Sequence, residues 1–314
     1  MIPLADVQHF VRAPDWTWYI LFYFFLAGLS GGSYFLAALL RLFGKKSDEP
    51  AARVGVYVSF VALLGCPVLL TLDLGKPLRF WHMLVNTTPG DEGPVFKYWS
   101  PMSVGAWALV IFGGFVTVSF VEALVRDQKI RMKVLERAVR LLNGGLGKLW
   151  ALAGGLLGLF IAGYTGVLLA VSNQPIWSDS WAVGGLFLAS GLTGSAALMA
   201  WLVHRRSDAR TSADVFVRMD RLFPLLELAL IVVFLALLVT PGMLSRTLAF
   251  PWVLLWAVAL VGLLPGLLGL SRSRLSITND GGVAAVSTSA LALASVVVLL
   301  GVLALRAAVI FSAQ

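Results

Sequence analysis

The run WTWYILFYFFLAGLSGGSYFLAALLRL, residues 16–42, decides the fold, because it is a long apolar segment with one charged side chain, Arg41. An α-helix needs about 20 apolar residues to cross the hydrocarbon core of a bilayer. Inside that core, only helices and closed barrels satisfy their backbone hydrogen bonds. A run of this length, rich in Leu, Ala and Gly, therefore predicts a transmembrane helix.

Further apolar runs of the same kind follow along the chain, and none of the connecting loops is large enough to be a soluble domain. We therefore expect residues 1–314 to form a single polytopic membrane domain of the all-α class, a bundle of eight transmembrane helices that could divide into two four-helix halves. The predicted spans are residues 16–42, 54–74, 101–125, 148–172, 181–204, 221–243, 248–270 and 283–310.

The composition excludes an ordinary soluble protein. Of the 314 residues, 59% are hydrophobic and only 13% are charged, whereas soluble domains contain about 25% charged residues. The formal net charge of +8 does not indicate a nucleic-acid partner, since the basic residues lie in the loops. We therefore expect this chain to contact membrane lipid and to have no nucleic-acid partner.

The loops that are rich in Lys and Arg alternate along the chain and so predict its orientation. Four loops, near residues 41–53, 126–148, 205–221 and 271–282, hold 4, 7, 5 and 2 of these residues, which is 18 of 24. The positive-inside rule places these loops in the cytoplasm. Both termini and the loop 75–100 then face outward. The remaining basic residues are assigned to that outer side: Arg12, Lys76, Arg79, Lys97, Arg246 and Arg306.

Two shorter patterns predict local structure. Apolar residues within 126–143 recur at the spacing of an amphipathic helix, which suits a segment lying on the inner membrane surface. The stretch GLSGGSYF, residues 28–35, places small residues at helical spacing, which favours close packing between helices.

The segment TLDLGKPLRFWHML, residues 71–84, gathers charged and polar side chains at the outer end of an apolar run. Because the spans alternate in direction, two tyrosines from other spans fall at the same depth. Such a cluster suits a quinone, whose carbonyls need hydrogen-bond partners and whose quinol form releases two protons. The alternative is an interfacial role, in which the cations reach the headgroups and the aspartate pairs with an arginine. The candidate quinone-binding residues are Tyr23, Asp73, Arg79, His82 and Tyr164.

Two carboxylates nearer the inner side extend this hypothesis to proton movement. Glu122 ends the third span, and Glu227 lies within the sixth, where an ionisable residue is costly and is a functional candidate by default. Together with Asp73 they form a candidate proton path, although Glu227 could instead pair with Arg218 or Arg221.

The residues that bind haem and iron–sulfur clusters are scarce in this sequence. The three histidines, His9, His82 and His204, fall at different depths, and haem in a bundle usually needs two at matched depth. Cys66 is the single cysteine, so no cysteine cluster exists to ligate iron–sulfur. We expect no haem, no iron–sulfur cluster and no metal site in this chain, and electron exchange with a partner docked outside the membrane.

Four motifs together resemble the NrfD family, the membrane subunits of polysulfide reductase and related respiratory complexes. They are the aromatic and glycine-rich run 16–32, LDLGKPLRFWHML at 72–84, SPMSVGAW at 100–107 and YTGVLLA at 164–170. By motif position, Asp73, Arg79 and Tyr164 carry over best to the family's site. The first span departs from the polysulfide reductase pattern, since Ile20 and Tyr23 stand where that pattern has an Asn and a His.

The resemblance implies a haem-free subunit that binds menaquinone or ubiquinone in a bacterial cytoplasmic (inner) membrane. It implies a ferredoxin-like iron–sulfur partner outside the cytoplasm, with a molybdopterin catalytic subunit or a multihaem cytochrome beyond it. Two other classes stay open. One is a proton-coupled secondary transporter, for which Pro67, Pro224 and Pro265 could kink the spans, and the other is a purely structural membrane anchor.

Overall fold

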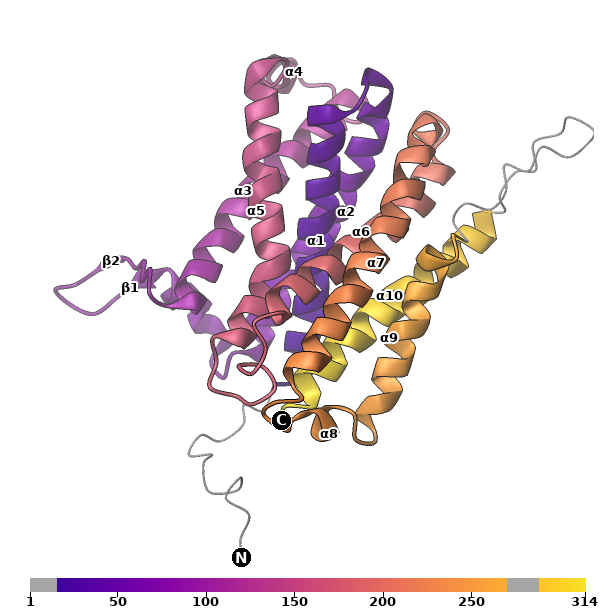
Figure 1. The fold of residues 1–314 in the computed structure, drawn as a ribbon. Coiled ribbons are helices and arrows are strands. Elements are labelled where there is room, and N and C mark those ends of the chain that lie inside the picture. Colours follow the sequence, from indigo (N-terminus) through magenta and orange to yellow (C-terminus); the bar gives the residue numbers. More distant parts are fainter. Residues whose placement is uncertain (1–15, 270–287) are drawn as a thin grey trace, which may run out of the picture.

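The computed structural model describes residues 16–269 and 288–314, which form a helical bundle (Figure 1). Two short strands, β1 (Val85–Asn86) and β2 (Gly93–Pro94), pair antiparallel in the loop between α2 and α3. The helices are α1 (Trp18–Phe43), α2 (Glu49–Asp73), α3 (Pro101–Arg126), α4 (Lys133–Leu141), α5 (Gly145–Ala170), α6 (Val183–Arg205), α7 (Ala213–Leu237), α8 (Leu244–Thr247), α9 (Trp252–Leu267) and α10 (Thr288–Phe311).

Six of these helices, α1, α2, α3, α5, α6 and α10, are long and apolar enough to cross a membrane. This confirms a helical, multi-pass membrane protein. Helices α7 and α9 occupy the other two predicted spans, but α9 has only 16 residues and α7 includes the charged Glu227. Eight crossings, and the outward position of both termini, therefore stay predictions. Residues 1–15 and 270–287, which contain Arg12 and one of the four basic loops, lie outside the described residues.

The long helices pack in two groups of four. Helices α1, α2, α3 and α5 contact one another in a ring, and α6, α7, α9 and α10 form a second ring. Contacts of α1 and α5 with α6 join the two rings, so α1 lies near the centre of the bundle. Most of α1 is buried, whereas α3 exposes much of its surface, as expected for a helix at the lipid boundary.

Small residues let α1 approach its neighbours closely, as the stretch 28–35 predicts. A Cβ on Gly191 of α6 would lie 3.0 Å from the carbonyl oxygen of Gly28. A Cβ on Gly158 of α5 would lie 2.7 Å from the carbonyl oxygen of Gly31. Backbones at this separation gain the van der Waals contact that holds helices together in lipid.

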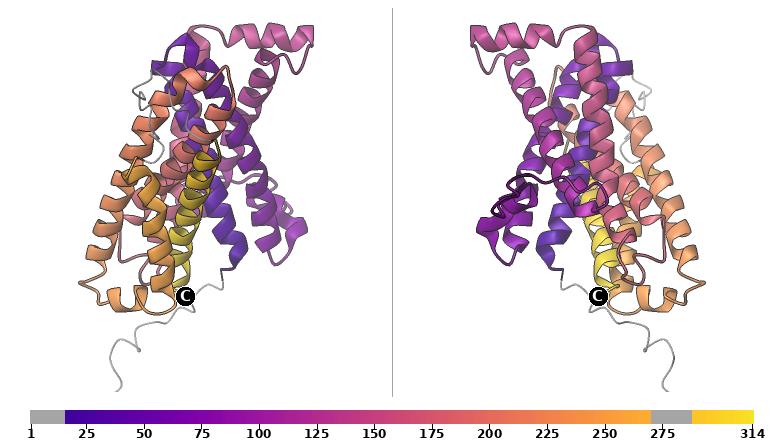
Figure 2. Two further views of the ribbon diagram at one scale, coloured as in Figure 1. Left: turned by 90° about the vertical axis from the view of Figure 1, so that its right-hand side faces the viewer. Right: turned by 90° about the vertical axis from the view of Figure 1, so that its left-hand side faces the viewer.

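The basic loops near residues 41–53, 126–148 and 205–221 lie at one end of the bundle. The end where α1 and α3 finish and α5 begins also carries α4, and we call it the basic end (Figure 1). The opposite end carries β1, β2, α8 and the C-terminus. Helix α4 has no buried residue and projects sideways from this end of the bundle, crosswise to the long helices (Figure 2). This confirms that a helix forms within 126–143.

One basic residue that was counted with the outer side lies inside the bundle. The structure buries Arg306 completely within α10, five residues before the helix ends at Phe311. Its guanidinium donates to Ser190 Oγ at 2.6 Å and to the carbonyl oxygen of Phe187 at 3.0 Å. These partners on α6 hold the charge inside the bundle, so Arg306 does not count as evidence for the orientation of the chain.

Candidate functional site

A cavity of about 190 Å³ opens at the end of the bundle opposite α4, where α1 begins and α2 ends. Its lining is mainly apolar and comes from α1, α2, α3, α5 and the segments beside them. The lining residues are Trp16, Ile20, Tyr23, Phe24, Leu70, Asp73, Leu74, Met83, Met102, Gly105, Ala106, Leu109, Tyr164 and Leu168. Three of the five candidate quinone-binding residues, Tyr23, Asp73 and Tyr164, therefore meet around one cavity.

Tyr23 reaches the cavity from the second turn of α1. The helix begins at Trp18, where Thr17 caps it by accepting a hydrogen bond from the backbone amide of Tyr19. Tyr23 is 5% exposed and packs against Phe24, with ring centroids 5.5 Å apart. Among the described residues, the hydroxyl of Tyr23 has no hydrogen-bond partner, so it is available to a bound molecule.

Tyr164 reaches the cavity from α5 and is held in a fixed position. Its hydroxyl donates a hydrogen bond to the carbonyl oxygen of Pro101 at 2.6 Å. A Cβ on Gly105 of α3 would overlap the ring of Tyr164, so the ring occupies space that only glycine leaves at that position. Phe160 stacks on the same ring, with centroids 5.5 Å apart.

Asp73 is the last residue of α2 and lies at the mouth of the cavity. Thr17 Oγ1 lies 3.5 Å from Asp73 Oδ1, so the carboxylate also connects the end of α2 to the start of α1. Asp73 is partly exposed, and in the described chain no cation pairs with it. Its carboxylate therefore lies at a place that water reaches, and its role in proton transfer stays a prediction.

Arg79 and His82 do not line the cavity. Both belong to the 3-10 helix Pro77–Met83, which follows α2 and is exposed along its length. The ring of His82 packs on that of Trp81, with centroids 4.1 Å apart. Of this segment, Met83 contributes to the lining. A direct contact of Arg79 or His82 with a quinone thus stays a prediction.

Some lining residues were not identified from the sequence. Trp16 stacks on Trp177, with ring centroids 4.9 Å apart, and its backbone amide donates to Gln314 Oε1 at 3.0 Å. Met83 and Met102 add flexible apolar surface. Each of the three lies within one of the four motifs. Trp and Met also occur in protein cores and at membrane interfaces, so the residue type alone did not indicate that they line a cavity.

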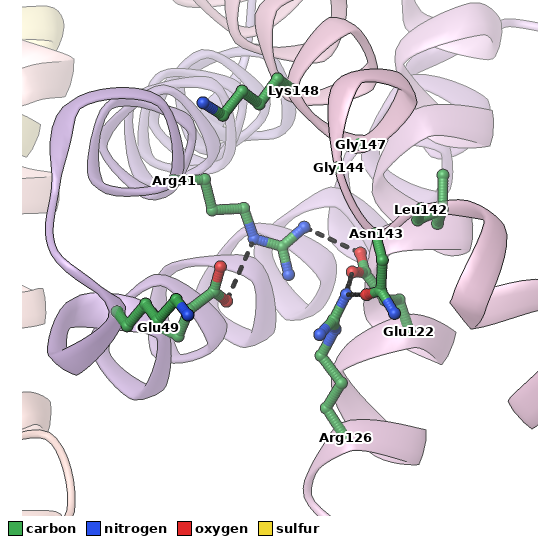
Figure 3. Close-up of a pocket in the computed structure, with 10 residues that line it drawn as sticks. Arg41, Glu49, Glu122, Arg126, Leu142, Asn143, Gly144, Gly147 and Lys148 are labelled. Carbon is green, nitrogen blue, oxygen red and sulfur yellow. Dashed lines mark hydrogen bonds and ion pairs between the residues drawn. The ribbon is translucent and has the colours of Figure 1, made fainter.

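Glu122, from the candidate proton path, lies at the basic end of the bundle. Arg41 Nη1 donates to its Oε2 at 2.7 Å, and Arg126 Nε donates to its Oε1 at 2.9 Å (Figure 3). Both oxygens of this carboxylate are therefore paired with cations.

Glu227 of the same path is fully buried in α7, away from the exposed side chains of Arg218 and Arg221. Arg306 on α10 acts on it electrostatically, but in the described chain the two side chains form no ion pair, and Glu227 Oε2 has no hydrogen-bond partner. Within the described residues, no hydrogen bond links Glu227, Glu122 and Asp73, so a proton path through them stays a prediction. Residues 16–269 and 288–314 also contain no group of three metal-ligating side chains.

Comparison with known proteins places this arrangement in a family. The family model described as polysulphide reductase, NrfD, matches residues 7–314. A selenate reductase subunit of Mesobacillus selenatarsenatis is 25% identical over 65% of this chain and 51% of its own length. Protein NrfD of Escherichia coli is 27% identical over 64% of each chain.

A third relative is the Hdr-like menaquinol oxidoreductase integral membrane subunit of Archaeoglobus fulgidus. It is 23% identical over 40% of this chain and 28% of its own length. The chain thus spans between about a quarter and two thirds of the curated relatives it matches. Because the family model covers nearly all of the sequence, the chain belongs to the NrfD (polysulphide reductase) family of membrane proteins.

Proposed function

We propose that this protein is the quinone-binding membrane subunit of a respiratory oxidoreductase, and that the cavity around Tyr23, Asp73 and Tyr164 holds the quinone headgroup. One observation carries the proposal: two tyrosine hydroxyls and one carboxylate converge on an otherwise apolar cavity at a helix end. A redox ring that alternates between carbonyl and hydroxyl forms needs both donors and acceptors of this kind. The name of the Archaeoglobus relative, a menaquinol oxidoreductase subunit, supports the same ligand class.

The cavity suits the ring of a quinone better than a large polar ligand. Its volume of about 190 Å³ is below the ~300–1,000 Å³ of pockets that enclose drug-sized ligands. A headgroup therefore fills it, and the isoprenoid tail continues along exposed apolar side chains such as Met102 and Leu72. A bound quinone supplies two-electron, two-proton redox chemistry.

The polar side chains have different tasks in this proposal. The hydroxyl of Tyr23, which has no partner in the described chain, would donate a hydrogen bond to a carbonyl oxygen of the headgroup. Tyr164 has committed its proton to Pro101, so its oxygen accepts a hydrogen bond from a quinol hydroxyl. Asp73, at the solvent-exposed mouth of the cavity, would accept protons that a bound quinol releases and pass them to water, while the two electrons would go to the iron–sulfur partner.

The proposed redox partner is a ferredoxin-like iron–sulfur subunit, with a molybdopterin enzyme or a multihaem cytochrome behind it. The connection from α2 to α3 exposes large apolar side chains beside the cavity, including Leu78 at 90%, Tyr98 at 76% and Trp99 at 68%. Exposed apolar patches of this kind mark interaction surfaces. The segment projects from the bundle at the end opposite the basic loops (Figure 2), which is outside the cytoplasm if the positive-inside rule holds.

The proposal is tested by titrating purified protein in lipid nanodiscs with a fluorescent quinone-site inhibitor. Tyr23→Phe removes one hydrogen bond, so binding weakens by about threefold to tenfold. The control is Tyr19→Phe, one helical turn earlier, where the side chain is exposed and outside the cavity. His82→Ala tests separately the prediction that His82 contacts the quinone. No saturable binding to the folded wild type, or an equal loss of affinity in Tyr19→Phe, contradicts the proposal.

A further inference from the structure

A second cavity, of about 280 Å³, lies at the basic end, far along the bundle from the quinone cavity. It is formed where α1 and α3 end and α2 and α5 begin, and Figure 3 shows its polar side chains converging. The lining residues are Arg41, Lys46, Glu49, Glu122, Arg126, Leu142, Asn143, Gly144, Gly147 and Lys148. No step of the proposed quinone chemistry uses this cavity.

The cavity holds more positive than negative charge. Its four cations face two carboxylates, and both carboxylates interact with Arg41: Nε lies 3.8 Å from Glu49 Oε2, and Nη1 lies 2.7 Å from Glu122 Oε2. Arg126 also pairs with Glu122, at 2.8 Å. Within the described chain, Lys46 and Lys148 have no acidic partner, so two positive charges stay uncompensated.

The guanidinium of Arg41 is incompletely satisfied. Its Nη2 is buried and, among the described residues, finds no acceptor for its two protons. In Figure 3 the Arg41 side chain lies between those of Glu49 and Glu122, and all three line the cavity. A buried donor left without an acceptor costs about 1–3 kcal/mol, so an acceptor oxygen in the cavity would relieve it.

The start of α5 adds a further preference for an anion. This helix begins at Gly145, and Gly144 and Gly147 line the cavity. The first amides of a helix have no partner within the helix, and its dipole makes this end positive. Side chains and backbone therefore favour the same kind of ligand.

The depth of the cavity matches that of lipid headgroups. Helix α1 has 26 residues and is about 39 Å long, against about 30 Å for the hydrocarbon core. A helix of this length centred on the core extends past it at both ends, which places Arg41, two residues before the end of α1, at the boundary of the core. Exposed apolar side chains flank the cavity, with Phe43 at 82%, Leu141 at 68% and Leu149 at 61%. The surroundings are those of an amphiphile, with an anionic head and apolar tails.

We infer that this cavity binds the phosphate headgroup of an anionic phospholipid. The phosphate oxygens accept from Arg41 Nη2 and pair with Lys46 and Lys148, and the acyl chains run along the exposed leucines of α5. Basic cavities between helices on the cytoplasmic side of membrane proteins bind such headgroups. Because its headgroup contacts the ends of α1, α2, α3 and α5, the bound lipid stabilises their packing. A free phosphate ion could form the same contacts with the basic side chains, but it has no acyl chains to pack against the exposed apolar side chains beside the cavity.

The test measures the thermal unfolding of delipidated protein in detergent after addition of phosphatidylglycerol, phosphatidylcholine or inorganic phosphate at constant ionic strength. The variant is Lys46→Glu with Lys148→Glu, at two exposed positions that leave the core intact. The control is Lys133→Glu with Arg137→Glu, which makes the same charge change on exposed α4 at the same end.

Phosphatidylglycerol raises the unfolding temperature of the wild type and the control, and phosphatidylcholine does not. In the cavity variant, the apparent affinity for phosphatidylglycerol falls by about tenfold or more, since each nearby Lys or Arg contributes to anionic-lipid binding. The inference is overturned if the control loses the same affinity, or if phosphatidylcholine stabilises equally well. It is also overturned if inorganic phosphate alone reproduces the stabilisation, because the ligand is then a soluble anion.

Discussion

The hydroxyl of Tyr164 on α5 donates a hydrogen bond to the carbonyl oxygen of Pro101, the first residue of α3, at 2.6 Å. This bond fixes the ring against the wall of the cavity and decides which way the hydroxyl proton points. The remaining lone pairs of the oxygen are then acceptors. Tyr23, across the cavity, keeps a free donor. The two tyrosines thus offer opposite hydrogen-bonding roles to one ligand.

The contact between Gly105 and Tyr164 predicts the effect of one added methyl group. Gly105→Ala places a Cβ on the ring of Tyr164, which must move or strain the helix pair. We expect unfolding in detergent to become easier by about 1–3 kcal/mol, as for other overpacked sites, together with weaker inhibitor binding. The control is Gly114→Ala on α3, where nothing lies within 4 Å of the new Cβ. Equal behaviour of the two variants in thermal unfolding would show that the ring is not confined.

The indole of Trp107 is expected to hold the exposed loop to the bundle. Its Nε1 donates to the carbonyl oxygen of Val95 at 2.7 Å, which joins α3 to the segment after β2. Trp107→Phe removes this bond, so limited proteolysis should cut the loop faster. Trp99→Phe is the control, because Trp99 is 68% exposed. If both variants are cut at the wild-type rate, another contact holds the loop.

Arg306 and Glu227 should depend on each other for stability. Arg306→Met removes a charge that acts electrostatically on Glu227 and deprives Ser190 and Phe187 of a donor. Loss of a hydrogen bond from a charged donor costs about 1.5–3 kcal/mol. Adding Glu227→Gln should restore part of the loss. A double-mutant cycle of thermal unfolding measures the coupling, and strictly additive effects would mean that the two charges do not interact.

A cluster at the basic end predicts how stability changes with pH. Asp127 accepts hydrogen bonds from Arg206 at 2.7 Å and from Tyr57 at 2.8 Å, and Arg53 lies 2.6 Å away. Burial alone would raise the pKa of Asp127, but these donors and charges hold it below its ordinary value of 3.8. The hydrogen bond from Arg206 likewise lowers the pKa of Asp208.

Because the folded pKa values are depressed, both carboxylates contribute stability above the ordinary value of 3.8 and lose it as the pH falls through the folded values. Thermal unfolding measured from pH 7 downward should therefore show a loss that begins near pH 4. Asp127→Asn should be less stable at neutral pH and show a shallower loss in acid. Asp91→Asn, in the exposed hairpin loop, is the control and should retain the wild-type profile.

The sequence predicted the long helices and the close packing of α1, because hydropathy and small residues act over a few turns. It also predicted that Tyr23, Asp73 and Tyr164 share a depth, because the spans alternate in direction. It did not predict that Tyr164 rests against Gly105 and Pro101. Those residues are far apart in the chain, and only the packing of α3 on α5 brings them together.

Arg306 shows where counting charges fails. A single arginine within the apolar stretch LLGVLALRAAVIF, residues 299–311, gives no signal of its depth. Its depth is set by Ser190 and Phe187, more than a hundred residues earlier, which accept its hydrogen bonds. The same limit applies to Arg79 and His82. Their spacing puts them near the cavity, but the short 3-10 helix leaves both side chains at the surface.

The central claim is tested most directly by photolabelling the protein in nanodiscs with an azidoquinone and mapping the labelled residues by mass spectrometry. We predict labels on residues that line the quinone cavity, such as Met83, Met102 and Leu168, and their loss when excess unlabelled quinone competes. A competed label confined instead to the apolar groove at Leu26, Val58 and Leu202, or no competed label at all, would contradict the account.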